Sequence, residues 1–191
     1  MAHIASGDWL TPAGTVVAIV GDGAADALTA LDGIRDVETL PLGDDDPSLG
    51  ARRIAAARSP WVVHDADPLG HVASAWVELF QERSTLGVLE IEVDAALSRF
   101  EAGEAIMPDY YIVLEPSSAE HTWRHWWCGA LGHRAPRRVL PVDAPASSMA
   151  DAVRRLLTSL PSSRPWPEPA SWLPSLKFDI PDRVGVRDTG R

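Results

Sequence analysis

The sequence predicts a three-layer α/β domain of the doubly wound, Rossmann-like type, built on a mostly parallel sheet of about six strands. Short apolar runs rich in β-branched residues alternate about six times with segments of helical periodicity. The runs are continuously hydrophobic, which is typical of parallel strands that are covered on both faces. Hydrophobic residues form 46% of the 191-residue chain, which is enough for one sizeable core.

The individual elements follow from these patterns. Strands are expected at the apolar runs 15–20, 37–42, 61–64, 86–93, 110–114 and 138–142. Helices are expected between and after them, at 24–34, 47–58, 68–80, 95–102, 117–131 and 148–160. Five of these helices begin at side chains that can cap backbone N–H groups, namely Asp46, Asp67, Asp94, Ser117 with Glu120, and Ser148 with Asp151.

The chain is expected to form one domain with two extensions. Residues 1–14 are interpreted as an N-terminal arm, 15–160 as the α/β domain and 161–191 as a tail. The tail holds six of the 16 prolines and two of the eight tryptophans, Trp166 and Trp172. Prolines at this density disfavour regular structure. We therefore expect an irregular tail that packs on the domain or on a partner, with its tryptophans as anchors.

Composition excludes several classes of protein. The chain carries 17 basic and 27 acidic side chains, a formal net charge of −10, whereas general nucleic-acid binding needs a cationic surface. The single cysteine excludes a disulfide framework and a multi-cysteine zinc site. No apolar run reaches the roughly 20 residues that span a bilayer, and the first residues lack the pattern of a secretory signal. We therefore expect a cytoplasmic protein that contacts no membrane.

Acidic side chains follow most of the predicted strands. They are Asp22, Asp44, Asp45, Asp46, Asp65, Asp67, Glu90, Glu92, Asp94 and Glu115. Ligands of open parallel sheets bind at the carboxyl ends of the strands, and clustered carboxylates suit Mg²⁺. Asp22, Asp65 and Asp67 are therefore candidate ligands of a magnesium ion. The alternative is that these carboxylates cap helices and contact solvent.

The turn after the first strand lacks an intact phosphate-binding motif. The Walker A pattern needs Gly, Lys and a hydroxyl where the chain has Asp26, Ala27 and Leu28. The dinucleotide fingerprint also fails, because Gly21 and Gly23 are not followed by a third glycine at 26. A degenerate relative of either fold is compatible with the pattern.

Two resemblances to known families cover parts of the chain. Over about residues 15–116, Asp22, Asp65 and the pair Glu115-Pro116 are similar to the acidic pair, the phospho-accepting aspartate and the Lys-Pro of a response-regulator receiver. Glu115 departs from that lysine, so the resemblance implies the fold without phosphotransfer. Over about residues 15–80, the acidic run 44–46 and the later Asp65-Ala66-Asp67 look like the nucleotide-sugar half of a family-2 glycosyltransferase. That resemblance implies an Asp-x-Asp site for a metal-diphosphate.

The segment 120–131 predicts an aromatic helix with a polar face. At helical spacing, one side carries Trp123, Trp126 and Trp127, and the other carries His121, His125 and Cys128. Two histidines and a cysteine at this spacing can hold zinc, with His133 as a further ligand. The alternative is that the tryptophans pack on the sheet while the histidines form a polar outer face.

The densest basic patch follows this helix, in a half of the chain (116–191) that carries 11 basic and 7 acidic residues. Its arginines are Arg134, Arg137 and Arg138. Together with Trp166 and Trp172 they are candidates for partner binding, because arginine and tryptophan are enriched at interface hot spots. The alternative is that the arginines pair with the acidic first half of the chain.

The sequence favours a non-catalytic or degenerate α/β regulatory module that binds another protein, because the standard catalytic signatures are missing. The alternative is a Mg²⁺- or Mn²⁺-dependent enzyme that acts on a nucleotide or nucleotide-sugar through an Asp-x-Asp site.

Overall fold

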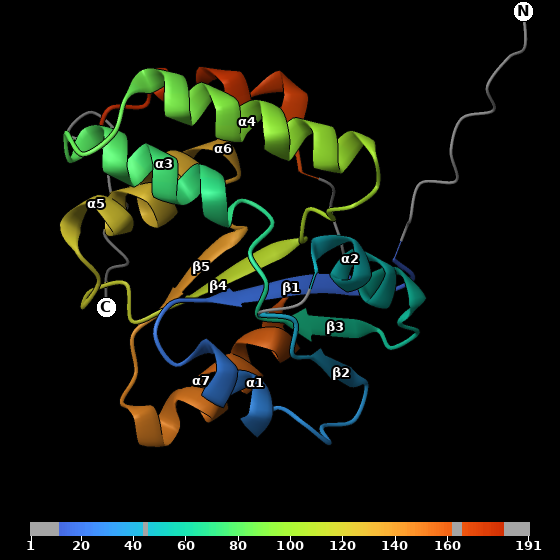
Figure 1. Cartoon of the computed structure of the whole chain (residues 1–191). Helices are drawn as coiled ribbons and strands as arrows, with labels where there is room; N and C mark the ends of the chain where they lie inside the picture. Colours follow the sequence, from blue (N-terminus) through green and yellow to red (C-terminus); the bar gives the residue numbers. More distant parts are fainter. Residues whose placement is uncertain (1–11, 44–45, 162–165, 182–191) are drawn as a thin grey trace, which may run out of the picture.

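Five apolar runs of the sequence pair into one parallel sheet (Figure 1). The computed structural model describes residues 12–43, 46–161 and 166–181. Its strands are β1 (Thr15–Val20), β2 (Val37–Leu40), β3 (Trp61–His64), β4 (Tyr110–Leu114) and β5 (Val139–Val142). They lie in the order β2-β3-β1-β4-β5, and each pairing is parallel. The predicted doubly wound α/β fold is confirmed.

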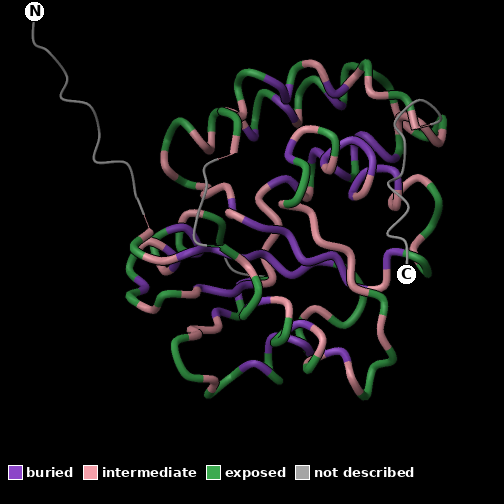
Figure 2. The backbone as a smooth tube through the Cα atoms, turned by 180° about the vertical axis from the view of Figure 1, so that it is seen from behind, coloured by how far each residue is buried: buried purple, intermediate pink, exposed green. Residues whose placement is uncertain are grey.

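Helices cover both faces of the sheet. One face carries α1 (Ala24–Ala30) and α7 (Ala146–Ser159), which pack together. The opposite face carries α2 (Pro47–Ala56), α3 (Gly70–Phe80), α5 (His121–Arg124), the π-helical segment η1 (His125–Leu131) and α6 (Gly132–Arg134). From β1 the chain goes to the edge strand β2, and then it runs back across the sheet through β3 to β4 and β5. Because crossovers between parallel strands are right-handed, this change of direction places α1 on one face and the later crossover helices on the other. Figure 2 shows the buried strands between these two layers.

The predicted strand 86–93 is wrong, because this segment begins helix α4 (Leu86–Glu101). Apolar and acidic residues alternate from Leu89 to Val93, which imitates the period of a half-buried strand. In the structure Leu89 and Val93 are buried, whereas Ile91 between them is 66% exposed. Burial at a spacing of four residues is helical, and it packs α4 on α3 as an outer layer (Figure 1). The sheet therefore has five strands rather than about six.

The predicted helix starts are partly correct. Asp46 caps α2, with Pro47 in its first turn. Asp94 lies inside α4 and cannot cap it. The two Ser-x-x-acid pairs do not act as capping boxes, because α5 begins after Glu120 and α7 begins before Ser148.

The described part of the predicted tail contains two short 3-10 helices, η2 (Pro169–Ser171) and η3 (Leu173–Phe178). Trp172, Leu173 and Leu176 are buried in the core beneath α3 and α4. The Nε1 of Trp76 on α3 donates a hydrogen bond to the carbonyl of Leu176, at 3.1 Å. This part of the tail therefore lies against the domain, while 162–165 and 182–191, like most of the predicted arm, lie outside the described residues. No helix in the described ranges is long and apolar enough to cross a membrane.

Candidate functional site

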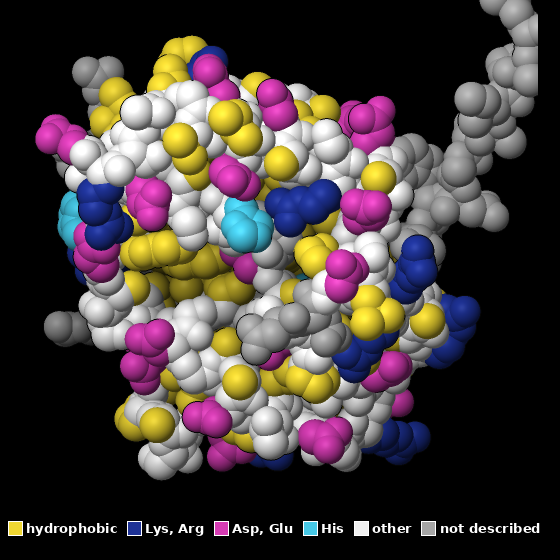
Figure 3. All heavy atoms as spheres, in the orientation of Figure 1, with side chains coloured by type: hydrophobic (Ala, Val, Ile, Leu, Met, Phe, Trp, Pro, Cys, Tyr) yellow, Lys and Arg dark blue, Asp and Glu magenta, His cyan; other side chains and the backbone are white. Residues whose placement is uncertain are grey.

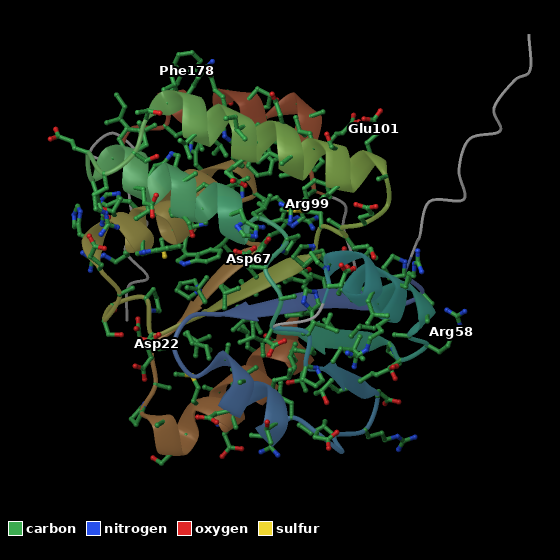
Figure 4. All side chains as sticks on the ribbon, in the orientation of Figure 1. Asp22, Arg58, Asp67, Arg99, Glu101 and Phe178 are labelled. Carbon is green, nitrogen blue, oxygen red and sulfur yellow. The ribbon has the colours of Figure 1, made fainter. Side chains whose placement is uncertain are left out.

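A cavity of about 320 Å³ lies at the carboxyl ends of β2 and β3. Its walls come from the loop 65–68 after β3, the N-terminal half of α2, Arg99 of α4 and the loop 104–106. Figure 4 shows Asp67 and Arg99 in the space between the sheet and α4. Figure 3 shows that this side of the molecule is hollowed below α3 and α5, where hydrophobic side chains form the floor and charged and histidine side chains lie at the rim. The volume is at the low end of the range for small-ligand pockets.

Two of the predicted acidic residues have structural partners in this region. Oδ1 of Asp65 accepts hydrogen bonds from the backbone N–H groups of Leu42 (2.7 Å) and Gly43 (3.0 Å), which holds the chain after β2 against β3. Oδ1 of Asp46 accepts from the hydroxyl (2.6 Å) and the backbone N–H (2.9 Å) of Ser48 at the start of α2. These bonds, the one from the Ser48 side chain above all, lower the pKa of Asp46.

Asp67 is a half-buried carboxylate of the cavity. Its Oδ1 accepts hydrogen bonds from the Tyr111 hydroxyl and from the backbone N–H of Leu69, both at 3.0 Å. Burial raises the pKa of Asp67 to about 6, although these bonds and the charges of His71 and Arg99 act in the opposite direction. Burial and the Asp67 carboxylate raise the pKa of Tyr111 well above its ordinary value, so the hydroxyl stays protonated and donates.

The register of the sheet explains how Asp67 reaches Tyr111. Ala18 of β1 pairs with His64 of β3 on one side and with Tyr111 of β4 on the other. Paired residues of parallel strands point to the same face, so these three form one row on the face that carries α3. Asp67 follows β3 and Tyr111 lies on β4, so the hydrogen bond between them crosses the end of β1 that separates the two strands.

His64 is the second buried titratable group in this cavity. It is 1% exposed, and neither ring nitrogen makes a hydrogen bond with a described residue. Burial lowers the pKa of His64 to about 4, while the Asp65 carboxylate and the backbone of Ala66 act to raise it. The imidazole is therefore neutral at pH 7 and can still accept a hydrogen bond from a ligand.

Asp22 lies in a separate cavity of about 370 Å³ at the ends of β1 and β4, which also contains Glu115 and Trp127. Gly21 opens the turn that leads there: its φ is 100°, and a Cβ on it would lie 2.6 Å from the carbonyl oxygen of Leu114. The turn leads to α1 on one face of the sheet, whereas the loop after β3 leads to α3 on the other face. This divergence separates Asp22 from Asp67, as Figure 4 shows.

The structure does not assemble the predicted magnesium ligands into one group. Within residues 12–43, 46–161 and 166–181, no three His, Cys, Asp or Glu side chains come close enough to share a metal ion. Asp65 bonds toward the end of β2, whereas Asp67 bonds toward β4. The acidic residues 90, 92 and 94 lie on α4 rather than at a strand end, and Asp44 and Asp45 lie outside the described residues.

The predicted zinc ligands are only partly together. Nε2 of His121 and Nε2 of His125 lie 3.2 Å apart, on neighbouring turns. Cys128 does not complete a metal group with them in the described part of the chain, and neither does His133. The π-helical segment η1 begins at His125, and its wider turn moves Cys128 away from the direction that α-helical spacing predicts. Burial raises the pKa of the Cys128 thiol, which disfavours the thiolate that binds zinc.

Most of the predicted partner-binding residues make contacts inside the domain. Arg134 binds Asp179 of the tail at 2.7 Å, and Trp172 is 3% exposed. Trp166 and Arg138 both donate to the carbonyl oxygen of Asp109, at 3.2 and 3.1 Å. Trp166 also packs edge-on against Tyr111, and the Arg138 guanidinium lies 5.8 Å from the ring centroid of Tyr110. Arg137, by contrast, is exposed.

Sequence reasoning missed two features of the site region. One is the group formed by Asp67, Tyr111 and Arg99. These residues are far apart in the chain, so no local sequence pattern indicates that they come together. The other is an exposed apolar surface on α4 and η3, which has Ile91 and Phe178 at 66% and 72% exposure. Ile91 between the buried Leu89 and Val93 would have indicated this surface had the segment been read as a helix.

The fold and its cavities define a doubly wound α/β protein with two cavities at the carboxyl edge of the sheet, in the described part of the chain. No protein-family model matches the chain, and a search of curated proteins finds no significant match.

Proposed function

We propose that the protein is a regulatory α/β module that binds another protein through the exposed face formed by α4 and η3. We call this face the α4–η3 surface and define it by Glu90, Ile91, Asp94, Lys177 and Phe178. The observation that carries the proposal is the exposure of Ile91 and Phe178, two large apolar side chains, on adjoining elements. Exposed apolar side chains that gather on one face mark interaction sites.

The α4–η3 surface contains a groove as well as exposed side chains. The groove has a volume of about 280 Å³ and lies between the two elements, above Leu89, Val93 and Leu173. At its rim the Lys177 ammonium contacts Oε1 of Glu90 at 2.8 Å. Ile91 and Phe178 directly follow these two rim residues in the chain. An apolar side chain of a partner can enter such a groove while its neighbours contact the exposed residues.

The charge of α4 indicates the chemistry of the partner. The helix carries four acidic residues, Glu90, Glu92, Asp94 and Glu101, and one basic residue, Arg99. Complementary charge favours a partner segment that presents an apolar side chain flanked by lysine or arginine. Binding to such a segment weakens as the salt concentration rises.

Two of the residues predicted to bind the partner, Trp172 and Arg134, support this surface from inside. Trp172 is buried in the core with residues of α3 and α4, and the Arg134 guanidinium binds Asp179 and Ser175 at the end of η3. These contacts hold η3 beside α4, so the tail contributes to binding by placing Phe178.

We do not extend the proposal to a Mg²⁺-dependent enzyme. The two residues of the Asp-x-Asp sequence, Asp65 and Asp67, direct their hydrogen-bonded oxygens toward different strands. An Asp-x-Asp site instead needs both carboxylates at one metal-diphosphate.

Affinity purification with matched variants tests the proposal. Ile91→Ser and Phe178→Ser remove the exposed apolar groups, and Leu49→Ser removes an apolar side chain of 50% exposure on α2 as a control. A partner enriched by the wild type and the control, but lost with the two variants, is then purified. We expect each surface variant to weaken its Kd about fivefold or more, as hot-spot truncation does, and the control to leave it unchanged. Equal Kd values for all four proteins would contradict the proposal.

A further inference from the structure

We propose that the cavity at the ends of β2 and β3 binds a small zwitterion, an α-amino acid with an aliphatic side chain. The cavity is lined by four carboxylates, two imidazoles and one guanidinium beside apolar side chains, and the groups that the proposal uses are Asp67, His64 and Arg99. The site is independent of the α4–η3 surface, although α4 contributes Arg99 to one and Ile91 to the other.

Asp67 and His64 can receive the ammonium group. Oδ1 of Asp67 accepts from Tyr111 and Leu69, which fixes the orientation of the carboxylate. His64 is 1% exposed and lines the same cavity, with no hydrogen bond to a described residue. An unpartnered buried acceptor is costly unless a donor reaches it. An ammonium has three donors, so it can serve a carboxylate and a neutral imidazole together.

Arg99 can receive the carboxylate group of the same ligand. Its guanidinium lines the cavity, and its Nε is buried with no hydrogen-bond partner among the described residues. A planar guanidinium matches a carboxylate with two parallel hydrogen bonds. Arg99 and Asp67 carry opposite charges and attract each other. A ligand with both an ammonium and a carboxylate can bind both side chains, whereas a simple amine or a simple acid can bind only one of them.

The remaining walls determine the side chain of the ligand. Part of these walls is apolar and comes from Leu42, Ala51, Ile54 and Ile106. A cavity of about 320 Å³ suits a small molecule. The carboxylates of Asp65 and Glu104 also line the cavity and disfavour a bare phosphate. These features together select a compact zwitterion with an aliphatic group.

Titration with three related probes tests this site. L-leucine carries both charges, isopentylamine lacks the carboxylate, and 4-methylpentanoate lacks the ammonium. Binding is measured by calorimetry and by the NMR resonances of the His64 ring, up to about 10 mM, where affinities of about −4 kcal/mol are detectable. We expect leucine to saturate the site, to shift the His64 resonances and to bind at least tenfold more tightly than either analogue.

Matched variants complete the test. Asp67→Asn keeps the acceptor for Tyr111, and Arg99→Gln keeps a polar side chain. We expect each to weaken leucine binding about tenfold or more, the loss typical of a charged hydrogen bond. Asp22→Asn in the other cavity serves as the control, and we expect it to change affinity less than about twofold. The proposal is overturned if leucine does not saturate, if isopentylamine binds as tightly, or if Asp67→Asn binds as the wild type does.

Discussion

Replacing Asp67 by asparagine is expected to stabilise the protein at neutral pH. The carboxylate is buried, and burial raises its pKa from the ordinary 3.8 to about 6. The folded state therefore binds this proton more tightly than the unfolded chain does. Asparagine keeps the oxygen that accepts from Tyr111 and Leu69, so the substitution removes the buried charge and leaves an acceptor in its place.

The size of the effect follows from the pKa shift. A shift from 3.8 to about 6 corresponds, at 1.36 kcal/mol per unit, to about 3 kcal/mol of unfolding free energy. Below about pH 4 both states are protonated and this cost is absent. It grows as the pH rises from about 4 to 6, and it is complete above pH 6. Asp67→Asn should therefore gain about 3 kcal/mol at pH 7 and nearly nothing at pH 4.

His64 has the opposite pH dependence, and the variant reveals it. Its pKa in the folded state is about 4 instead of 6.5, so the unfolded chain binds its proton more readily. The stability due to the neutral imidazole is complete above pH 6.5 and is lost as the pH falls toward 4. In the wild type the two effects oppose each other across this interval. In Asp67→Asn the His64 effect remains alone, so unfolding free energy should fall on acidification from pH 6.5.

Urea unfolding across about pH 4 to 8 measures both effects, with the free energy of unfolding taken from the midpoint and slope. Glu104→Gln, at an exposed position of the same cavity, is the control and should follow the wild type. The reasoning would be refuted if Asp67→Asn had a lower free energy of unfolding than the wild type at pH 7. It would also be refuted if the difference in unfolding free energy between the two proteins did not change with pH.

Three further predictions concern other parts of the fold. Leu89→Ala should cost about 2–5 kcal/mol of unfolding free energy, whereas Ile91→Ala should change it by less than about 0.5 kcal/mol. If urea unfolding showed similar losses for both variants, the assignment of this segment to a helix would be contradicted. Trp172→Ala should cost about 3–5 kcal/mol, because its side chain is buried in the core, and a loss under about 1 kcal/mol would indicate that the tail does not support the domain. Calorimetry with Zn²⁺ should show a weak site that His121→Ala removes and Cys128→Ala leaves intact, because the two histidine Nε2 atoms are 3.2 Å apart and Cys128 does not complete a metal group with them. If both variants lost zinc binding equally, the hypothesis of a three-ligand zinc site would stand instead.

The sequence contained enough information for the sheet but not for one helix. Continuous apolar runs marked β1, β3 and β4 at the observed boundaries, because strands buried on both faces leave no room for polar residues. The segment 86–93 alternates like a strand because α4 is apolar on two sides, one packed on α3 and one exposed. Alternation alone could not distinguish a strand from a helix that has one apolar side packed and another exposed in the described part of the chain.

The location of the candidate site could be predicted from the sequence, but the set of residues that forms it could not. The rule that ligands bind at the carboxyl ends of parallel strands directed attention to Asp65 and Asp67, which line the cavity at the ends of β2 and β3. The same rule did not show that Asp22 lies in a different cavity. Whether the loop after a strand turns to one face of the sheet or the other depends on the strand order, which the sequence pattern does not give. Tyr111 and Arg99 reach Asp67 only through the register of β4 and the packing of α4, and neither is visible in local sequence.

Photocrosslinking from the α4–η3 surface tests most directly whether this protein works by binding another protein. A photoreactive amino acid is placed at position 91, at 178 or, as a control, at 49, and cross-linked peptides are identified by mass spectrometry in cells. We predict that positions 91 and 178 cross-link the same partner, at an apolar segment flanked by basic residues, and that position 49 does not. Cross-links only to second copies of this chain, equal cross-linking from position 49, or no cross-link from 91 and 178 would contradict the account.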